Sequence, residues 1–124
     1  MSKSIQDIVA EARAAVPAVS QEDAVAMMGA DNVLVVDVRD GGEVAESGKI
    51  KGALNVSRGM LEFNADAATP YYNEAFTKDK TIILYCGSGG RAALCGRALM
   101  ELGYTDVRNL GAFNDWVENG GAVE

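Results

Sequence analysis

Histidine is absent from the 124 residues of this chain. Its absence excludes the Ser-His-Asp triad and the Cys-His pair of nucleophilic enzymes, and it excludes nearly every catalytic zinc site. A nucleophile in this protein must therefore be activated by backbone dipoles and cationic side chains. We expect neither a metal ion nor a cofactor to take part in its chemistry.

Cysteine is also scarce, and the chain contains only Cys86 and Cys95. Two cysteines cannot form the disulfide framework of a small secreted domain, and both are expected to be thiols in a reducing compartment. Cys95 falls on the apolar face of a predicted helix. We therefore expect it to be a packing residue and not a resolving thiol.

Long apolar runs and excess positive charge are missing as well. No segment approaches the roughly 18 apolar residues of a membrane helix, and the polar amino terminus lacks the apolar core of a secretion signal. A cytoplasmic protein is therefore expected. The net charge of −7 argues against nucleic acid or an anionic membrane as the partner. It leaves room for a small anionic substrate, because local charges set the field at a site.

Helical and strand patterns alternate along what we expect to be one domain. Helical spacing of apolar residues over 5–16 and 91–102 predicts helices, and apolar runs at 33–37 and 81–86 predict strands covered on both faces. Weaker patterns predict further strands at 53–56 and 106–110 and short helices at 20–28, 58–63, before Lys80 and at 112–119. This alternation is typical of an α/β fold with a mainly parallel sheet and helices on both faces.

The most informative segment joins a predicted strand to a predicted helix. It consists of Cys86, Gly87, Ser88, Gly89, Gly90 and Arg91. Open α/β folds bind ligands at the carboxyl ends of their strands. Glycines let successive backbone amides converge on one point, and the start of a helix adds its unpaired N–H groups there. A cysteine in this position is expected to be a thiolate at neutral pH, and Arg91 offers planar donors to an oxyanion.

The same segment has other interpretations. A lone cysteine at a strand end is usually a small buried hydrophobic residue, and glycines there are often an ordinary turn. The segment also satisfies the dinucleotide fingerprint G-x-G-x-x-A, but only 32 residues follow Ala92, too few for the rest of such a fold. A cysteine phosphatase has five residues between its cysteine and arginine, whereas four separate Cys86 from Arg91.

With these residues in view, the chain resembles a rhodanese-homology domain over about residues 20–124, which leaves residues 1–19 as an N-terminal helical extension. Cys86, Gly89 and Arg91 fit the C-x-x-G-x-R loop of that family. The residues that fit its first signature are Asp37, Arg39, Glu43, Gly48, Ile50, Gly52, Ala53 and Asn55. Those that fit its last segment are Leu102, Gly103, Tyr104, Gly111 and Trp116. Lys49 stands where the family usually has histidine.

The resemblance implies a five-stranded, mainly parallel sheet and the transfer of sulfane sulfur from thiosulfate or a persulfide to a thiol or cyanide. Cys86 would hold the sulfur as a persulfide, and residues 87–91 would bind the donor. Arg58 matches an arginine of a single-domain subgroup and is a further candidate for donor binding, while Asp37 and Arg39 are expected to support the loop. Association into a homodimer is compatible with this family.

Two alternatives to a sulfurtransferase stay open. The first is a non-catalytic or sulfur-relay binding module. The second is a phosphatase or arsenate reductase, which the resemblance associates with a loop one residue longer. The partners expected from the favoured interpretation are a small sulfur-anion donor and a thiol acceptor, with neither nucleic acid nor membrane involved.

Overall fold

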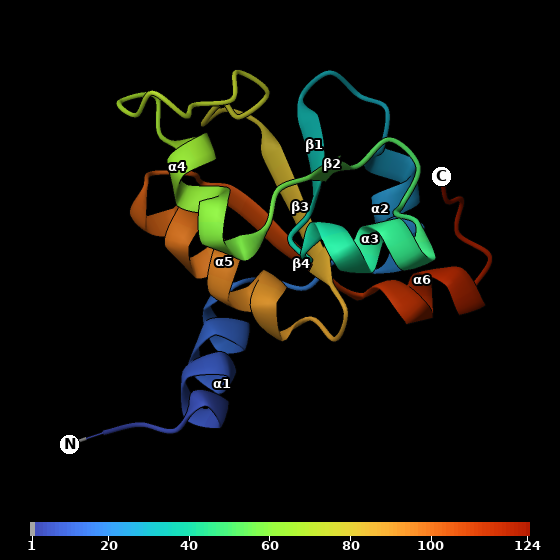
Figure 1. Ribbon diagram of the computed structural model, residues 1–124, viewed down its shortest axis with the longest axis horizontal. Helices are drawn as coiled ribbons and strands as arrows, with labels where there is room; N and C mark the ends of the chain where they lie inside the picture. The colour runs from blue at the N-terminus through green and yellow to red at the C-terminus, as the bar shows by residue number, and fades with distance from the viewer. Residues whose placement is uncertain (1) are drawn as a thin grey trace.

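The computed structural model describes residues 2–124 and has a parallel sheet between two layers of helices (Figure 1). The strand order is β2-β1-β3-β4, and every neighbouring pair is parallel. The predicted α/β class with helices on both faces is confirmed. The elements are α1 (Ile5–Ala15), α2 (Gln21–Met27), β1 (Val33–Asp37), α3 (Gly41–Ser47), β2 (Leu54–Asn55), η1 (Arg58–Met60), α4 (Leu61–Ala65), β3 (Thr81–Cys86), α5 (Gly90–Glu101), β4 (Asp106–Ala112) and α6 (Phe113–Glu118).

The central strand β3 is buried along its whole length because both of its faces are covered. Ile82, Leu84 and Cys86 lie in one apolar cluster, and Ile83 and Tyr85 lie in the other. This division follows the alternation of side chains along a strand. Figure 1 places α4 and α5 on one side of the sheet and α2 and α6 on the other. The side chain of Cys86 therefore faces the α5 layer.

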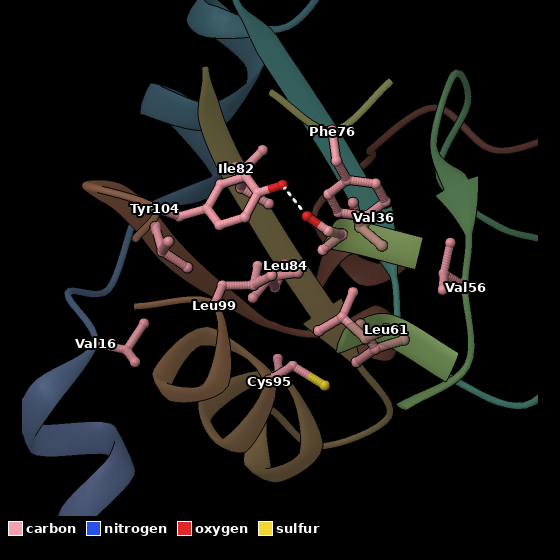
Figure 2. Close-up of a cluster of buried hydrophobic side chains, with 14 of the residues drawn as sticks. Val16, Val36, Val56, Leu61, Phe76, Ile82, Leu84, Cys95, Leu99 and Tyr104 are labelled. Atoms are coloured by element: carbon pink, nitrogen blue, oxygen red, sulfur yellow. Dashed lines mark hydrogen bonds between the residues drawn. The ribbon is translucent and has the colours of Figure 1, made fainter. Parts of the chain in front are cut away.

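The cluster beneath α5 is the larger part of the core (Figure 2). Phe76 and Tyr104 meet edge to face, with ring centroids 6.4 Å apart. The Tyr104 hydroxyl donates to the Ala65 carbonyl at 2.7 Å, and burial raises the pKa of Tyr104 to about 12. Cys95 lies in the same cluster, on the helix face predicted for it, and burial raises the pKa of its thiol to about 12. Cys95 is therefore a packing residue.

The helix α1 packs against α5, and its C-cap residue Val16 belongs to this core cluster. A capping box between Ser4 and Asp7 starts the helix. At the other end of α1, Val16 approaches α5 at Gly96, where a Cβ atom would lie 2.9 Å from the valine methyl groups. The absence of a side chain at Gly96 therefore lets this amino-terminal segment pack closely against the domain.

The sheet of the described residues has four strands and not the expected five. The place beside β4 is taken by the connection between α1 and α2, through one parallel bridge between Ala18 and Asn109. Asn109 donates its N–H to the Pro17 carbonyl at 2.8 Å and accepts from the Val19 N–H at 3.0 Å. Proline has no N–H to continue the ladder, and Ser20 already caps α2. A full fifth strand cannot form in so short a segment.

Two local predictions also differ from the structure. The short helix expected before Lys80 is replaced by turns, in which the Lys80 N–H donates to the Thr77 carbonyl at 3.1 Å. Conversely, the segment after β1, which is not among the predicted helices, forms the two-turn helix α3. None of the helices within residues 2–124 combines the length and the apolar character that crossing a membrane demands.

Candidate active site

The candidate site lies where β3 ends and α5 begins. β1 and β3 are neighbours at the centre of the sheet. The strand that follows β1, β2, lies on one side of this pair, and the strand that follows β3, β4, lies on the other side. This arrangement is the topological switch point at which open α/β sheets bind ligands. Gly89 caps α5 with a φ of +92°, a conformation that residues with side chains rarely adopt. A Cβ atom at Gly89 would also lie 3.2 Å from the Cα of Gly111.

The sulfur of Cys86 is directed at backbone amides. Its Sγ accepts from the Gly89 N–H at 2.9 Å and from the Ala92 N–H at 3.4 Å. The side chain has no exposed surface, although the next two residues, Gly87 and Ser88, are exposed. A cysteine that served only as packing would have apolar atoms alone around its sulfur, without hydrogen-bond donors. Cys86 instead combines burial with two N–H donors, an arrangement that stabilises a sulfur anion.

Arg91, in the first turn of α5, is paired with a carboxylate from α3. Its Nη1 and Nη2 donate to the two carboxylate oxygens of Glu43 at 2.7 and 2.9 Å. The hydrogen bond from Arg91, followed by one from the Asp40 backbone, lowers the pKa of Glu43 to about 2. The pKa of Arg91 is raised by the same carboxylate. Arg91 thus reaches the site with two of its donors already engaged.

Glu43 is a site residue to which the sequence assigned no role. The sequence places it only within the first signature, and its role depends on a contact with a residue 48 positions away. A local signal is present, since Asp40 and Glu43 form a capping box at the start of α3. That signal predicts the helix end but not the partner of the carboxylate.

Two further residues hold the loop from outside. Arg13 of α1 donates from Nη2 to the Ser88 carbonyl at 3.2 Å. Asn109 of β4 donates from Nδ2 to the Gly89 carbonyl at 3.1 Å, and its Oδ1 accepts the Gly111 N–H at 2.9 Å. Neither residue was a candidate from the sequence, because both contacts join positions far apart in the chain.

Asp37 and Arg39 form a buried pair at the end of β1. The Asp37 carboxylate accepts from the Arg39 backbone N–H at 2.9 Å and from its Nη2 at 2.7 Å. The same Nη2 donates to the Gly48 carbonyl at 2.7 Å, and the guanidinium lies 4.2 Å from the ring centroid of Phe113. The pair therefore ties the end of α3 to the sheet. It supports the helix that presents Glu43 and makes no hydrogen bond to Cys86 within residues 2–124.

Comparison with known proteins identifies the family. The model of the family described as "Rhodanese-like domain" matches residues 20–119. The chain belongs to this family. A sulfurtransferase from Allochromatium vinosum is 32% identical over 91 residues, which cover 73% of this chain and 77% of that protein.

Solved structures of similar proteins agree with this assignment of the fold. A Rhodopseudomonas palustris protein of unknown function, described as a possible tyrosine phosphatase, superposes with a TM-score of 0.91 and 35% identity, covering 100% of this chain and 96% of that one. The polysulfide-sulfur transferase homodimer of Wolinella succinogenes gives a TM-score of 0.77 and 28% identity, covering 96% of this chain and 85% of that one. Both neighbours match more of the chain than the family model does.

Two positions noted for the rhodanese family lie away from the sulfur contacts. Arg58 is exposed at the start of η1, and within residues 2–124 no hydrogen bond or ion pair joins its guanidinium to the loop. Lys49, at the usual histidine position, donates from Nζ to the Ala53 carbonyl at 2.7 Å and pairs with Glu124. Lys49 thus ties the carboxyl terminus to the segment after α3.

A groove of about 350 Å³ lies beside the rhodanese loop, between that loop and α1. Its wall is formed by Ile5, Gln6, Val9, Ala10, Arg13, Ser88 and Gly90. Among the described residues, no three histidine, cysteine or carboxylate side chains converge as a metal site would require. The groups at the loop that can bind an anion include backbone amides, the Ser88 hydroxyl and the guanidinium of Arg13.

Proposed function

We propose that this protein is a sulfurtransferase that holds the transferred sulfur on Cys86. The observation that supports this most directly is the pair of N–H groups, from Gly89 and Ala92, 2.9 and 3.4 Å from the Cys86 Sγ. Sγ carries the negative charge of the attacking thiolate, and these two donors stabilise it there; after loading, the charge passes to the terminal sulfur of the persulfide. Membership of the rhodanese family and a sulfurtransferase relative support the same reaction class.

The first half-reaction loads the cysteine. The Cys86 thiolate attacks the sulfane sulfur of thiosulfate or of a persulfide. With thiosulfate, a bond forms between Sγ and the sulfane sulfur, the sulfur–sulfur bond of thiosulfate breaks, and its electron pair leaves with sulfite. No proton, metal or external oxidant is required, because one anionic sulfur replaces another.

The second half-reaction unloads the persulfide. An acceptor thiolate or cyanide attacks the terminal sulfur, forms a new bond to it and returns the electron pair of the broken bond to Sγ. The products are an acceptor persulfide or thiocyanate, together with the original Cys86 thiolate. A histidine-free site suits this cycle, because neither half-reaction needs a general base once the thiolate has formed.

Arg91 and Glu43 have a joint role in this proposal. The guanidinium lies against the loop, with Nη2 3.1 Å from the point where a Cβ atom of Gly87 would stand. Glu43 fixes the orientation of this guanidinium through two hydrogen bonds, and its negative charge partly offsets the positive potential of Arg91. Arg91 therefore presents a fixed and moderate positive potential to an arriving donor. A moderate potential suits a site that must release sulfite as readily as it binds thiosulfate.

Phosphoryl transfer is the competing activity. The Rhodopseudomonas palustris neighbour is described as a possible tyrosine phosphatase, so the experiment below also measures phosphatase activity. The loop from Cys86 to Arg91 has four intervening residues. A loop of this length makes a smaller ring of amides than the five-residue loop of cysteine phosphatases. The smaller ring suits one terminal sulfur atom better than a phosphoryl group with three oxygens.

The decisive experiment weighs the intact protein after incubation with thiosulfate and after a second incubation with cyanide. We expect one added sulfur atom, its removal by cyanide and the formation of thiocyanate. Cys86→Ser should lose all three results, while the matched Cys95→Ala variant should retain them. An unloaded wild-type protein would refute the proposal, and hydrolysis of an aryl phosphate that depends on Cys86 would establish the competing activity instead.

A further inference from the structure

The peptide unit between Ser88 and Gly89 is hydrogen-bonded on both of its sides. Its carbonyl oxygen accepts from Nη2 of Arg13 at 3.2 Å, and its N–H donates to the Cys86 Sγ at 2.9 Å. A trans peptide is planar, and its C=O and N–H point in opposite directions. No peptide bond among the described residues is cis. A contact that fixes the direction of this carbonyl therefore also fixes the direction of the N–H that meets the sulfur.

The absence of a side chain at residue 89 makes room for this contact. A Cβ atom at Gly89 would lie 3.2 Å from Nη1 and 3.4 Å from Nη2 of Arg13. The glycine thus adopts the left-handed conformation that the turn needs and also admits the guanidinium to the outer side of the loop. The positive charge of Arg13 polarises the peptide along its C=O and N–H axis, which makes the N–H a stronger donor to an anion.

The segment after α1 restrains the next peptide of the loop through a second residue. Asn109 donates to the Gly89 carbonyl at 3.1 Å, and its own backbone is paired with Pro17 and Val19. Residues 13–19 therefore reach consecutive peptides of the loop in two ways, directly through Arg13 and indirectly through the backbone of Asn109. Residues 13–19 precede the family match at residues 20–119.

From these contacts we propose that Arg13 is a positioning residue for the reactive cysteine. It acts through the Ser88–Gly89 peptide, whose N–H it aims and polarises toward Cys86. The amino-terminal helix thereby becomes part of the active site, although it supplies no group that touches the sulfur. This inference rests on the proposed role of Cys86 as a sulfur anion, but its test needs no sulfur donor.

Other charged groups near the sulfur must be separated from the effect of Arg13. Arg91 of α5 lies near enough to Cys86 for their charges to interact and is paired with Glu43 of α3, and Asp40 lies at the start of α3. Arg58 of η1 lies near enough to α5 to lower the pKa of the Cys95 thiol, but burial dominates and holds that pKa at about 12. Cys95 is therefore uncharged in the neutral range and does not contribute to the alkylation profile measured for Cys86.

The test compares the pH profiles of alkylation of Cys86 by iodoacetamide, followed by mass spectrometry, in the full-length protein. The variants are Arg13→Gln, Arg13→Lys and the matched control Arg97→Gln. Arg97 is an exposed arginine of α5 at the interface with α1, where it approaches Glu11 at 4.0 Å. Its replacement changes the net charge equally and does not alter the contacts of the loop. Cys86→Ser provides the blank.

We expect Arg13→Gln to move the midpoint of the profile upward by about 0.5–1 pH unit, because a weaker donor stabilises the thiolate less. Arg13→Lys should shift it by less than Arg13→Gln, since the charge and one donor remain. Arg97→Gln should leave it unchanged. The inference would be overturned if the midpoint of Arg13→Gln equalled that of the wild-type protein. It would also be overturned if Arg97→Gln shifted the midpoint as much as Arg13→Gln does, because that result would show a general effect of charge.

Thiosulfate loading, measured on the same samples, separates this inference from the proposed function. If the wild-type protein takes up no sulfur while Arg13→Gln still shifts the profile, the sulfurtransferase proposal fails and the positioning role stands. If Arg13→Gln takes up sulfur and keeps the wild-type profile, the positioning role fails and the sulfurtransferase proposal stands.

Discussion

The carboxylate of Glu43 holds the guanidinium of Arg91 through two hydrogen bonds of 2.7 and 2.9 Å, and so joins α3 to the first turn of α5 across the carboxyl edge of the sheet. The two residues are 48 positions apart in the chain. Their contact combines two effects that mutation can separate. It orients Arg91, and it places a negative charge beside a site proposed to bind anions.

Glu43→Gln removes the charge and retains a side chain that can still accept one hydrogen bond. We expect the KM for thiosulfate to fall about two- to fivefold, because a dianionic donor no longer approaches a carboxylate. The effect should weaken as ionic strength rises. Steady-state kinetics at low and high salt measure it. Glu46→Gln, with the same charge change on the same helix, is the control, and a KM that rises or stays constant in Glu43→Gln would contradict this account.

The pKa of Glu43 also predicts how stability depends on pH. Arg91 lowers that pKa from 4.5 to about 2, so the pair stabilises the folded state fully above pH 4.5 and loses this contribution as the pH falls toward 2. The pair is partly exposed, which limits its contribution to about 1 kcal/mol or less.

Urea unfolding at neutral pH and at about pH 3 checks this expectation. The wild-type free energy of unfolding should decrease more between the two pH values than that of Glu43→Gln. Equal decreases in the two proteins would show that the ion pair contributes nothing to acid stability.

Gly89→Ala tests the geometry of the loop. Alanine is strained at a φ of +92°, and its Cβ atom would meet both Arg13 and Gly111. We expect a loss of about 1–3 kcal/mol in the free energy of unfolding and at least a tenfold loss in the rate of sulfur loading, because the Gly89 N–H moves away from the sulfur. Gly59→Ala is the matched control, since a Cβ atom at Gly59 would meet no atom of the described residues within 4 Å. Equal behaviour of the two variants would refute the proposed importance of this turn.

The two cysteines should differ sharply in reactivity. Burial holds the pKa of Cys95 at about 12 and places its sulfur in the core (Figure 2). Cys86 is equally buried, but its sulfur accepts two backbone N–H groups and the two residues that follow it are exposed. In the native protein, iodoacetamide should modify Cys86 alone, as peptide mapping by mass spectrometry can determine. Cys95→Ala should lower the free energy of unfolding by about 1–2 kcal/mol and leave sulfur loading intact. Modification of Cys95 at a rate comparable to that of Cys86 would contradict the structure.

Local sequence was sufficient to predict the elements that build the loop. The apolar run of β3, the glycines after Cys86 and the helical spacing of α5 each depend on neighbours within a few residues. The same is true of the capping box between Ser4 and Asp7 that starts α1. The missing fifth strand follows from local chemistry too, since Pro17 lacks an N–H, but the sequence does not reveal that its segment lies beside β4.

The sequence by itself determined the α/β class, the cysteine loop at a strand end and the exclusion of histidine chemistry, because each follows from residue type and short spacing. Only the tertiary structure decided that Glu43 engages Arg91 and that Arg13 meets the Ser88 carbonyl. The order of the strands and the packing of α1 on α5 bring these groups together. Periodicity reports which face of an element is buried, and it carries no information about which distant residue will stand opposite.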